Sequence, residues 1–514
     1  MAELFLVPAT AATPSDARPP DWLAREQALD VRQSWIVEAP AGSGKTGLLI
    51  QRYLKLLADE SVEQPEQVLA ITYTVKATAE IRDRVVAQLR SAAGTDTSTS
   101  EFERETRKLA EDVLRRDELL GWRLLEHPRR LNLRTIDSVC GEIARSLPVL
   151  SGGGGRQSPV ADATLLYREA ARRTLMQLGG TDSALNESLR TVLLHRDGNL
   201  GNLEQLLAEM LALRDQWGEL IPLSDVELDD AYLDGTVLPQ LQRALEQAVC
   251  AGLTQLAQTF PPAFLEELAT LAAEMAHAEG YNGEPSPLAV CAQLRGAPEE
   301  SAQHLAHWRA LIHLLTTKDR KWRTGTARNH LRFEIEADHA VRLKHLIEQV
   351  RHRDDLLTAI QQVKHLPPAE YPQSQWLVAK ALFRVLRRAL VELQLVFAQR
   401  GECDFTELGL LARTALLHSG AVDDLAAALG MKLQHLLVDE MQDTSTSQYQ
   451  LIELLTHGWD GHSQTVFLVG DPKQSIYLFR QARVERFVRT MLNESLGDLP
   501  VEEKIGRASC RERV

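Results

Sequence analysis

A short glycine-containing loop near the N-terminus has the residue types needed to bind phosphate groups. Its glycines allow successive backbone N–H groups to turn inward around phosphate oxygens, and a following helix would offer its N-terminus to the same anion. Lys45 can place a positive charge on the β- and γ-phosphates of a nucleotide, and Thr46 can offer a hydroxyl to Mg²⁺. Ala39 stands where the general pattern has its first glycine. The loop consists of Ala39, Pro40, Ala41, Gly42, Ser43, Gly44, Lys45 and Thr46.

Two adjacent carboxylates far along the chain complement this loop. Asp439 and Glu440 follow the apolar run LQHLL, as at the end of a buried strand. A carboxylate here would hold Mg²⁺ through water, because hard cations prefer oxygen ligands. The second carboxylate would polarise an attacking water as a general base. An Asp-Glu pair alone is weak evidence, since surface carboxylates are common, but the following residues Met441 to Thr444 make the pattern specific.

The surrounding segments predict the elements that would position these residues. SWIVEAP and QVLAITYT are typical of buried strands, and each is followed by a stretch with helical periodicity. Residues 156–395 are almost entirely helical in pattern, and strand character returns at LQHLLVDE and TVFLVGD. The order strand, loop, helix favours a parallel α/β sheet and argues against a chance GSGKT outside a nucleotide site.

Six motifs in the same order resemble those of the UvrD/Rep-type superfamily 1 DNA helicases. VDEMQDTS is similar to the VDEFQDT segment of that family, and VGDPKQSIYLFRQA resembles its motif III. TYTVKATAEIRDRV resembles motif Ia, and RTIDSVC resembles the TIHSFC segment. Gln27 occupies the place of the family's adenine-reading glutamine. The resemblance implies an α/β fold, namely a RecA-like sheet domain interrupted by a large all-helical insertion domain.

The resemblance also implies roles for individual residues. Gln474 would sense the γ-phosphate, and Arg480 could bridge it to the phosphate. Tyr477 and Phe479 would stack on single-strand bases, although packing in the core is the alternative for both. The DNA backbone would be contacted by Thr72, Thr74, Lys76, Thr135 and Ser138. Several positions depart from the family pattern and put single DNA contacts in question: Val75, Asp137, Val139, Leu478 and Gln481.

The long helical segment narrows the resemblance to the AddA/RecB-like branch. LLTTKDRKWR, PVADATLLYREAAR and GECDFTELGLLARTAL resemble stretches of those recombination helicases. The branch implies a 3′-to-5′ motor of double-strand-break repair that uses ATP and Mg²⁺, binds single-stranded and duplex DNA, and works with a second helicase–nuclease subunit. A basic cluster around Trp322 could contact duplex phosphates, and its alternative is a solvated surface loop. The cluster contains Lys318, Arg320, Lys321, Arg323 and Arg328.

Net charge, apolar stretches and cysteine spacing limit the classes of protein to which the chain could belong. The net charge of −14 argues against a protein that coats DNA over its whole surface, but leaves room for one basic groove. We expect no membrane helix and a cytoplasmic location, because no apolar stretch approaches the ~20 residues that span a bilayer. The five cysteines form no metal-binding pattern, and we expect scattered buried thiols.

The predicted domains are a flexible N-terminus at 1–20, a motor domain 1A at 21–150 and 396–503, and a helical domain 1B at 151–395. The last eleven residues, 504–514, back-translate into a string that resembles a sequencing-library adapter. We therefore expect the natural protein to continue past Glu503 into a second motor domain, and we expect this fragment to hydrolyse ATP poorly. The alternatives are a genuine basic tail, a natural half-motor that acts as a regulatory module, and a translocase without unwinding activity.

Overall fold

The computed structural model describes most of the chain. The described residues are 22–40, 42–94, 100–146, 157–223, 227–319, 321–419, 432–474 and 484–503. The chain divides into two compact units. The first comprises Met1–Ala171, Leu207–Glu219 and Val391–Val514, and the second comprises Arg172–Leu206 and Leu220–Leu390. The domain boundaries expected from the sequence stay a prediction.

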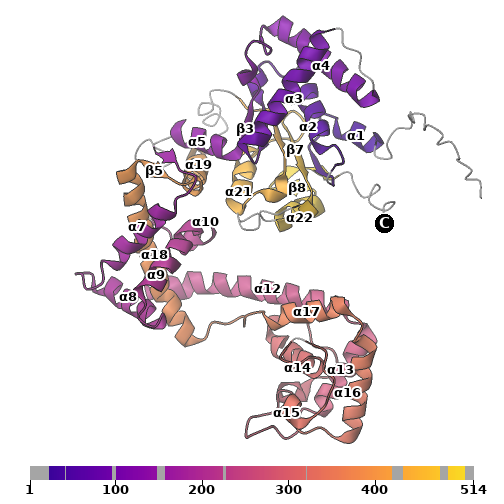
Figure 1. The fold of residues 1–514 in the computed structure, drawn as a ribbon, viewed down its shortest axis with the longest axis vertical. Helices are drawn as coiled ribbons and strands as arrows, with labels where there is room; N and C mark the ends of the chain where they lie inside the picture. The colour runs from indigo at the N-terminus through magenta and orange to yellow at the C-terminus, as the bar shows by residue number, and fades with distance from the viewer. Residues whose placement is uncertain are drawn as a thin grey trace, which may run out of the picture. The chain divides into compact units, whose positions relative to one another are not determined.

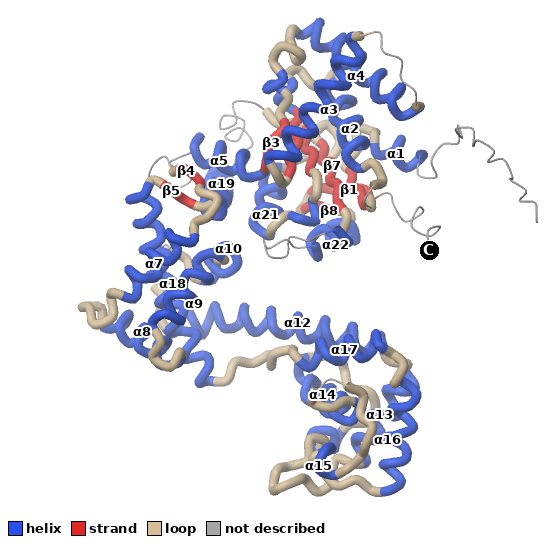
Figure 2. The backbone as a smooth tube through the Cα atoms, viewed as in Figure 1, coloured by secondary structure: helices blue, strands red, loops and turns tan. Residues whose placement is uncertain are grey.

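A parallel six-stranded sheet forms the centre of the first unit (Figure 2). Its order is β10-β1-β7-β6-β2-β3. Trp35 of β1 lies opposite Phe467 of β7, and Val438 of β6 lies opposite Ile71 of β2, so strands from the two ends of the chain pair with each other. The strands are β1 (Trp35–Glu38), β2 (Val68–Thr72), β3 (Leu133–Thr135), β6 (His435–Val438), β7 (Thr465–Gly470) and β10 (Glu502–Glu503).

Amphipathic helices bury their apolar stripes with one face of this sheet. Helices α2 (Lys45–Leu57), α3 (Val75–Ala93) and α4 (Glu101–Leu120) lie together in Figure 1. Leu49, Val85 and Val113, one from each helix, join Val37 and Phe467 in a single buried cluster. Buried parallel strands read as apolar runs because both of their faces are covered. The predicted α/β class is confirmed.

A second group of helices surrounds α19 (Phe405–Ser419), which packs on α5 (Ile136–Ser146) and α21 (Thr446–Leu455). A short parallel pair, β4 (Ser158–Pro159) and β5 (Glu402–Cys403), brings together the chain entering and leaving the helical region. Beside it, Arg214 of α10 (Arg214–Trp217) is buried and donates to both carboxylate oxygens of Asp404, at 2.7 and 2.6 Å. These contacts fix the root of the insertion within the first unit.

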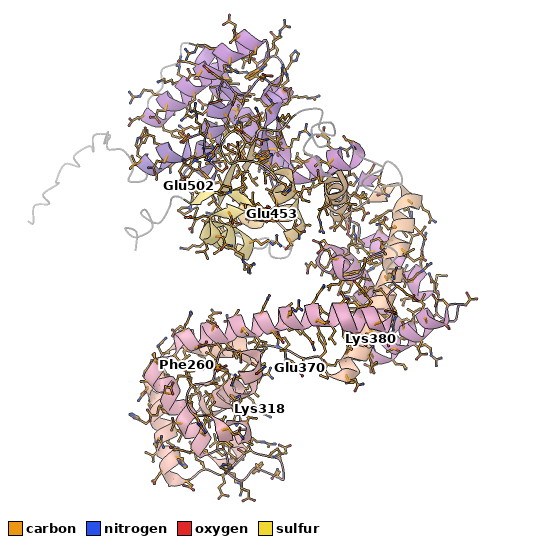
Figure 3. The ribbon with its side chains drawn as sticks, turned by 180° about the vertical axis from the view of Figure 1, so that it is seen from behind. Phe260, Lys318, Glu370, Lys380, Glu453 and Glu502 are labelled. Atoms are coloured by element: carbon orange, nitrogen blue, oxygen red, sulfur yellow. The ribbon has the colours of Figure 1, made fainter. Side chains whose placement is uncertain are left out.

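The second unit is helical, as the sequence predicts. Its main core lies among helices α12 (Leu238–Thr259), α13 (Pro262–Glu274), α14 (Leu305–Leu315), α16 (Ala337–Val350) and α17 (Asp354–Lys364). Phe260, labelled in Figure 3, stacks on Phe264 with ring centroids 5.6 Å apart and contacts Trp308 at 6.5 Å. Helix α18 (Gln373–Arg400) begins in this unit, where Lys380 lies 3.3 Å from Asp234.

Candidate nucleotide and DNA site

The phosphate-binding loop lies between β1 and α2, as its sequence predicts. Gly42 and Gly44 have φ angles of 75° and 84°, in the left-handed region that residues with a Cβ rarely adopt. Gly44 is the N-cap residue of α2, so the backbone N–H groups of the first helical turn face the loop. Ala39 ties the loop to β7 by donating its N–H to the Gly470 carbonyl at 3.1 Å. Ala41 lies outside the described residues.

Three predicted catalytic side chains converge at the carboxyl ends of neighbouring strands. The Lys45 Nζ atom lies 3.5 Å from Oε2 of Glu440 and donates to Oε1 of Gln474 at 3.2 Å. These partners are 395 and 429 residues away in the sequence. The Lys45 side chain is only 9% exposed, so its charge acts in a medium where electrostatic interactions are stronger than in water. The arrangement suits a lysine that neutralises a terminal phosphate.

The two carboxylates after β6 have different environments. Asp439 is buried, and its backbone N–H donates to the Ile71 carbonyl at 2.9 Å. Burial, followed by the neighbouring charge of Glu440, raises the pKa of Asp439 to about 6. Glu440 has a φ of 52°, which is uncommon for a residue with a side chain and often marks functional sites. A buried carboxylate beside a second one fits a divalent cation, because the cation would offset both charges. Thr46 and Asp439 are the residues that would hold Mg²⁺.

Gln442 links these carboxylates to the loop that follows β7. Its Nε2 donates to Oε2 of Glu440 at 2.7 Å, and its Oε1 accepts the N–H of Asp471 at 2.9 Å. Asp471 in turn accepts from the amide of Gln474. A Cβ on Gly470 would lie 2.6 Å from Oε1 of Gln442, so this close approach requires glycine. No role for Gln442 or Asp471 was predicted from the sequence, although both lie inside recognised motifs.

Helix α1 (Trp22–Ala28) brings a further unpredicted residue to the loop. Gln27, the expected adenine reader, is exposed on this helix. Arg25 reaches the loop itself, because its guanidinium donates to the Ser43 carbonyl. Ser43 Oγ is buried and has no hydrogen-bond partner among the described residues, which fits a site that accepts an anion. Arg52 fixes the chain after α1 by donating to the carbonyls of Ala28, Asp30 and Gln33 at 2.7, 2.6 and 2.7 Å.

The predicted DNA contacts divide into exposed and buried side chains. A groove of about 640 Å³ separates the start of α3 from α5, and both Thr135 and Ser138 line it. Lys76 is exposed at the start of α3, whereas Thr74 caps that helix by accepting the Ala77 N–H at 3.1 Å. Thr72 is 2% exposed, and its hydroxyl bonds to that of Thr78 inside the turn, so it shapes the groove.

The groove also contains residues that were not predicted from the sequence. Arg82, Arg134 and Arg145 line it, which makes its wall basic. Arg134 pairs with Glu142, and Arg82 donates to the Leu133 carbonyl at 2.7 Å. Of the remaining predicted site residues, Tyr477, Phe479 and Arg480 lie outside the described residues.

The basic cluster of the second unit is partly structural. Arg323 is 5% exposed and donates to the carbonyls of His313, Thr316 and His330, so it holds its own loop together. Arg328 pairs with Glu334 at 3.4 Å. Lys318, labelled in Figure 3, and Lys321 are exposed. The expectation that Arg323 contacts phosphates therefore needs correction. Contact with duplex phosphates stays an expectation for Lys318 and Lys321 alone. Arg320 lies outside the described residues.

Comparison with known proteins defines the class to which this fold and site belong. The UvrD/REP helicase N-terminal domain family matches residues 23–492, and the chain belongs to that family. Among curated relatives, the ATP-dependent helicase/nuclease A subunit of Moorella thermoacetica is 28% identical over 491 residues, covering 91% of this chain and 32% of that protein. The corresponding protein of Streptococcus sanguinis is 26% identical over 468 residues, covering 88% and 34%. The chain thus spans about a third of the length of these relatives.

A shorter match has a higher identity. The corresponding helicase/nuclease protein of Listeria innocua is 41% identical over 90 residues, which are 18% of this chain and 7% of that protein. The predicted membership of the UvrD/Rep-type family is confirmed, and the relatives named here are all A subunits of ATP-dependent helicase/nucleases, in line with the predicted AddA-like branch. Within the described part of the chain, no helix combines the length and apolarity needed to cross a membrane.

Proposed function

We propose that this chain binds ATP, Mg²⁺ and single-stranded DNA, as the nucleotide-binding part of a 3′-to-5′ DNA helicase or translocase of double-strand-break repair. The observation that carries the proposal is the convergence of Lys45, Glu440 and Gln474 at the phosphate-binding loop. Their separation in the sequence means that only the fold brings them together. The direction of movement rests on the family resemblance.

Each of these residues has a distinct task in ATP hydrolysis. Lys45 offsets the charge of the β- and γ-phosphates, which is the main requirement of phosphoryl transfer. Glu440 orients and polarises the attacking water. Gln474 contacts Lys45 directly and Asp471 on its own loop, so a change at the γ-phosphate alters the start of the segment that leads to Tyr477. Bound Mg²⁺ would supply further positive charge at the phosphates.

DNA binding is proposed for two surfaces. The groove between α3 and α5 would hold the backbone of a single strand near Lys76, Thr135 and Ser138, with Tyr477 and Phe479 stacking on its bases. Such stacking is tolerant of sequence, as a motor requires. Lys318 and Lys321 of the second unit would contact duplex phosphates. The names of the relatives describe them as subunits, and the partner we propose is a second helicase–nuclease subunit.

Nucleotide-dependent DNA binding tests this proposal. The affinity of the chain for a fluorescent single strand is measured with and without ATP and Mg²⁺, for the unaltered protein, Lys45→Ala, and Lys344→Ala as an exposed lysine control on α16. We expect ATP to change the affinity of the unaltered protein and of Lys344→Ala, but not that of Lys45→Ala. A single-strand affinity that is independent of ATP in all three proteins contradicts the proposal.

A further inference from the structure

A cavity lies beside the phosphate-binding loop, and none of the site residues predicted from the sequence lines it. It has a volume of about 360 Å³ and lies between α1, α2 and α4. Its lining includes the aromatic residues Trp22 and Phe102, the guanidinium of Arg25, and the polar side chains Gln51 and Glu105. Phe102 belongs to α4 and is 38% exposed, so part of its ring is accessible to a ligand.

Phe102 covers the first turn of the helix that follows the loop. A Cβ placed on Gly47 would lie 2.9 Å from Cζ of the Phe102 ring, so the ring occupies the space that a side chain at position 47 would fill. Arg25 approaches from α1, since a Cβ on Gly44 would lie 3.3 Å from its Nη1. An aromatic ring and a guanidinium therefore flank the same end of the loop.

The orientation of a bound nucleotide follows from the residues on the side of the phosphate-binding loop that faces away from Phe102 and Arg25. Lys45 meets Glu440 and Gln474, which marks the side of the loop where the γ-phosphate belongs. The ribose and base must then extend the opposite way, beyond the α-phosphate. Arg25 contacts Ser43, and the Phe102 ring lies over Gly47 at the start of α2. The cavity is thus placed where the base would emerge.

We propose that Phe102 and Arg25 hold the base of the bound nucleotide in this cavity, with Phe102 as its stacking platform. This inference rests on the proposed nucleotide binding and adds the residues that recognise the base. Aromatic rings and guanidinium planes both stack on nucleobases, and cation–π attraction adds to the contact. Gln51 and Glu105 lie in the wall of the cavity, and the amide of Gln51 donates to the Thr106 hydroxyl at 2.9 Å. Helix α4 thereby serves the nucleotide site as well as the core.

Comparison of two ligands separates base binding from phosphate binding. Equilibrium binding of ATP and of inorganic triphosphate is measured with Mg²⁺ for the unaltered chain and for Phe102→Ala. We expect Phe102→Ala to weaken ATP binding about fivefold or more, as loss of an aromatic stacking partner does, and to leave triphosphate binding unchanged. Phe405→Ala is the matched control, because Phe405 of α19 is similarly exposed at 42% and should affect neither ligand.

The outcomes distinguish this inference from the proposed function. Equal weakening of ATP and triphosphate would show that Phe102 only packs the loop, and no weakening of either would show that the base lies elsewhere; both results overturn the inference. An unaltered chain that binds neither ligand contradicts the proposed function itself. As a second test, Gly47→Ala should weaken ATP binding when Phe102 is present and add little in the Phe102→Ala background, because its new methyl group displaces the ring. If the effects of Gly47→Ala and Phe102→Ala on ATP binding are fully additive, Gly47→Ala does not act through the Phe102 ring.

Discussion

Replacing Arg214 by methionine should strongly destabilise the first unit, because it leaves two buried carboxylates without their counter-charge. The guanidinium donates to both oxygens of Asp404 and to Oε2 of Glu407 at 2.9 Å. The side chains of Arg214, Asp404 and Glu407 are 2%, 6% and 5% exposed, so water cannot replace these bonds. Burial raises the pKa of Asp404, but the hydrogen bonds and charge of Arg214 outweigh it, and the net pKa is lowered.

Removing one partner of a buried ion pair costs about 3–5 kcal/mol. We therefore expect Arg214→Met to lower the free energy of unfolding of the first unit by about that amount, measured by urea denaturation with a probe in this unit. Arg400→Met is the control, because Arg400 is 58% exposed in its pair with Glu169, and its loss should not be measurable.

A double-mutant cycle tests the cause of this loss. In an Asp404→Asn, Glu407→Gln background, where no carboxylate is left uncompensated, Arg214→Met should cost clearly less, since contacting residues show interaction energies of about 0.5–3 kcal/mol. A loss of stability in Arg214→Met no larger than that in Arg400→Met, or an equal loss in both backgrounds, would show that the buried carboxylates are not its cause.

Three further predictions follow from other parts of the chain. Burial, followed by the charge of Arg52, lowers the pKa of His435 to about 4. The free energy of unfolding should therefore fall by up to about 3 kcal/mol as the pH drops from 6.5 toward 4, because the buried imidazole must then take up a proton. His435→Gln should flatten this pH dependence, and identical pH profiles of stability in the variant and the unaltered protein would contradict the prediction. The double substitution Lys318→Ala, Lys321→Ala should weaken duplex DNA binding and leave the melting temperature unchanged, whereas Arg323→Met should lower the melting temperature. An unchanged affinity for duplex DNA in the double variant would argue against DNA contacts by Lys318 and Lys321. The chain should bind ATP but hydrolyse it slowly, because Lys45 is the one cationic side chain that the described residues bring to Glu440 and Gln474, and phosphoryl transfer depends on more positive charge than one lysine supplies. Vigorous DNA-stimulated hydrolysis in a phosphate-release assay would overturn this expectation.

The predictable parts of the site are those whose geometry is set locally. The loop at 39–46 and the carboxylates after β6 follow directly from short motifs, because a strand end, a glycine turn and a helix start are specified by adjacent residues. The α/β class was predictable for the same reason, since SWIVEAP and TVFLVGD are continuous apolar runs of the kind that buried parallel strands require. The sequence did not predict which strands pair, such as β1 with β7 and β2 with β6, because these segments lie far apart along the chain.

The parts that could not be predicted depend on contacts between distant segments. Nothing in the sequence near Phe102 shows that its ring would cover Gly47, because α4 must first pack on α2. The sequence around Arg214 does not distinguish it from an exposed helical arginine, because its partner Asp404 lies 190 residues later in the chain. Arg323 was expected to be exposed in a basic loop, yet three backbone carbonyls bind its guanidinium. Charge patterns alone do not separate solvated arginines from buried ones.

Equilibrium titration with ATP and Mg²⁺ decides whether Lys45 and its partners form an ATP site. The measurement compares the unaltered chain with Lys45→Ala, Glu440→Gln and the Lys344→Ala control. We expect Lys45→Ala to lose most of the ATP affinity and Lys344→Ala to keep it. We expect Glu440→Gln to bind ATP at least as tightly as the unaltered chain, because Lys45 is released from its carboxylate partner at 3.5 Å. Equal ATP affinity in the unaltered chain and Lys45→Ala would contradict an ATP site at Lys45.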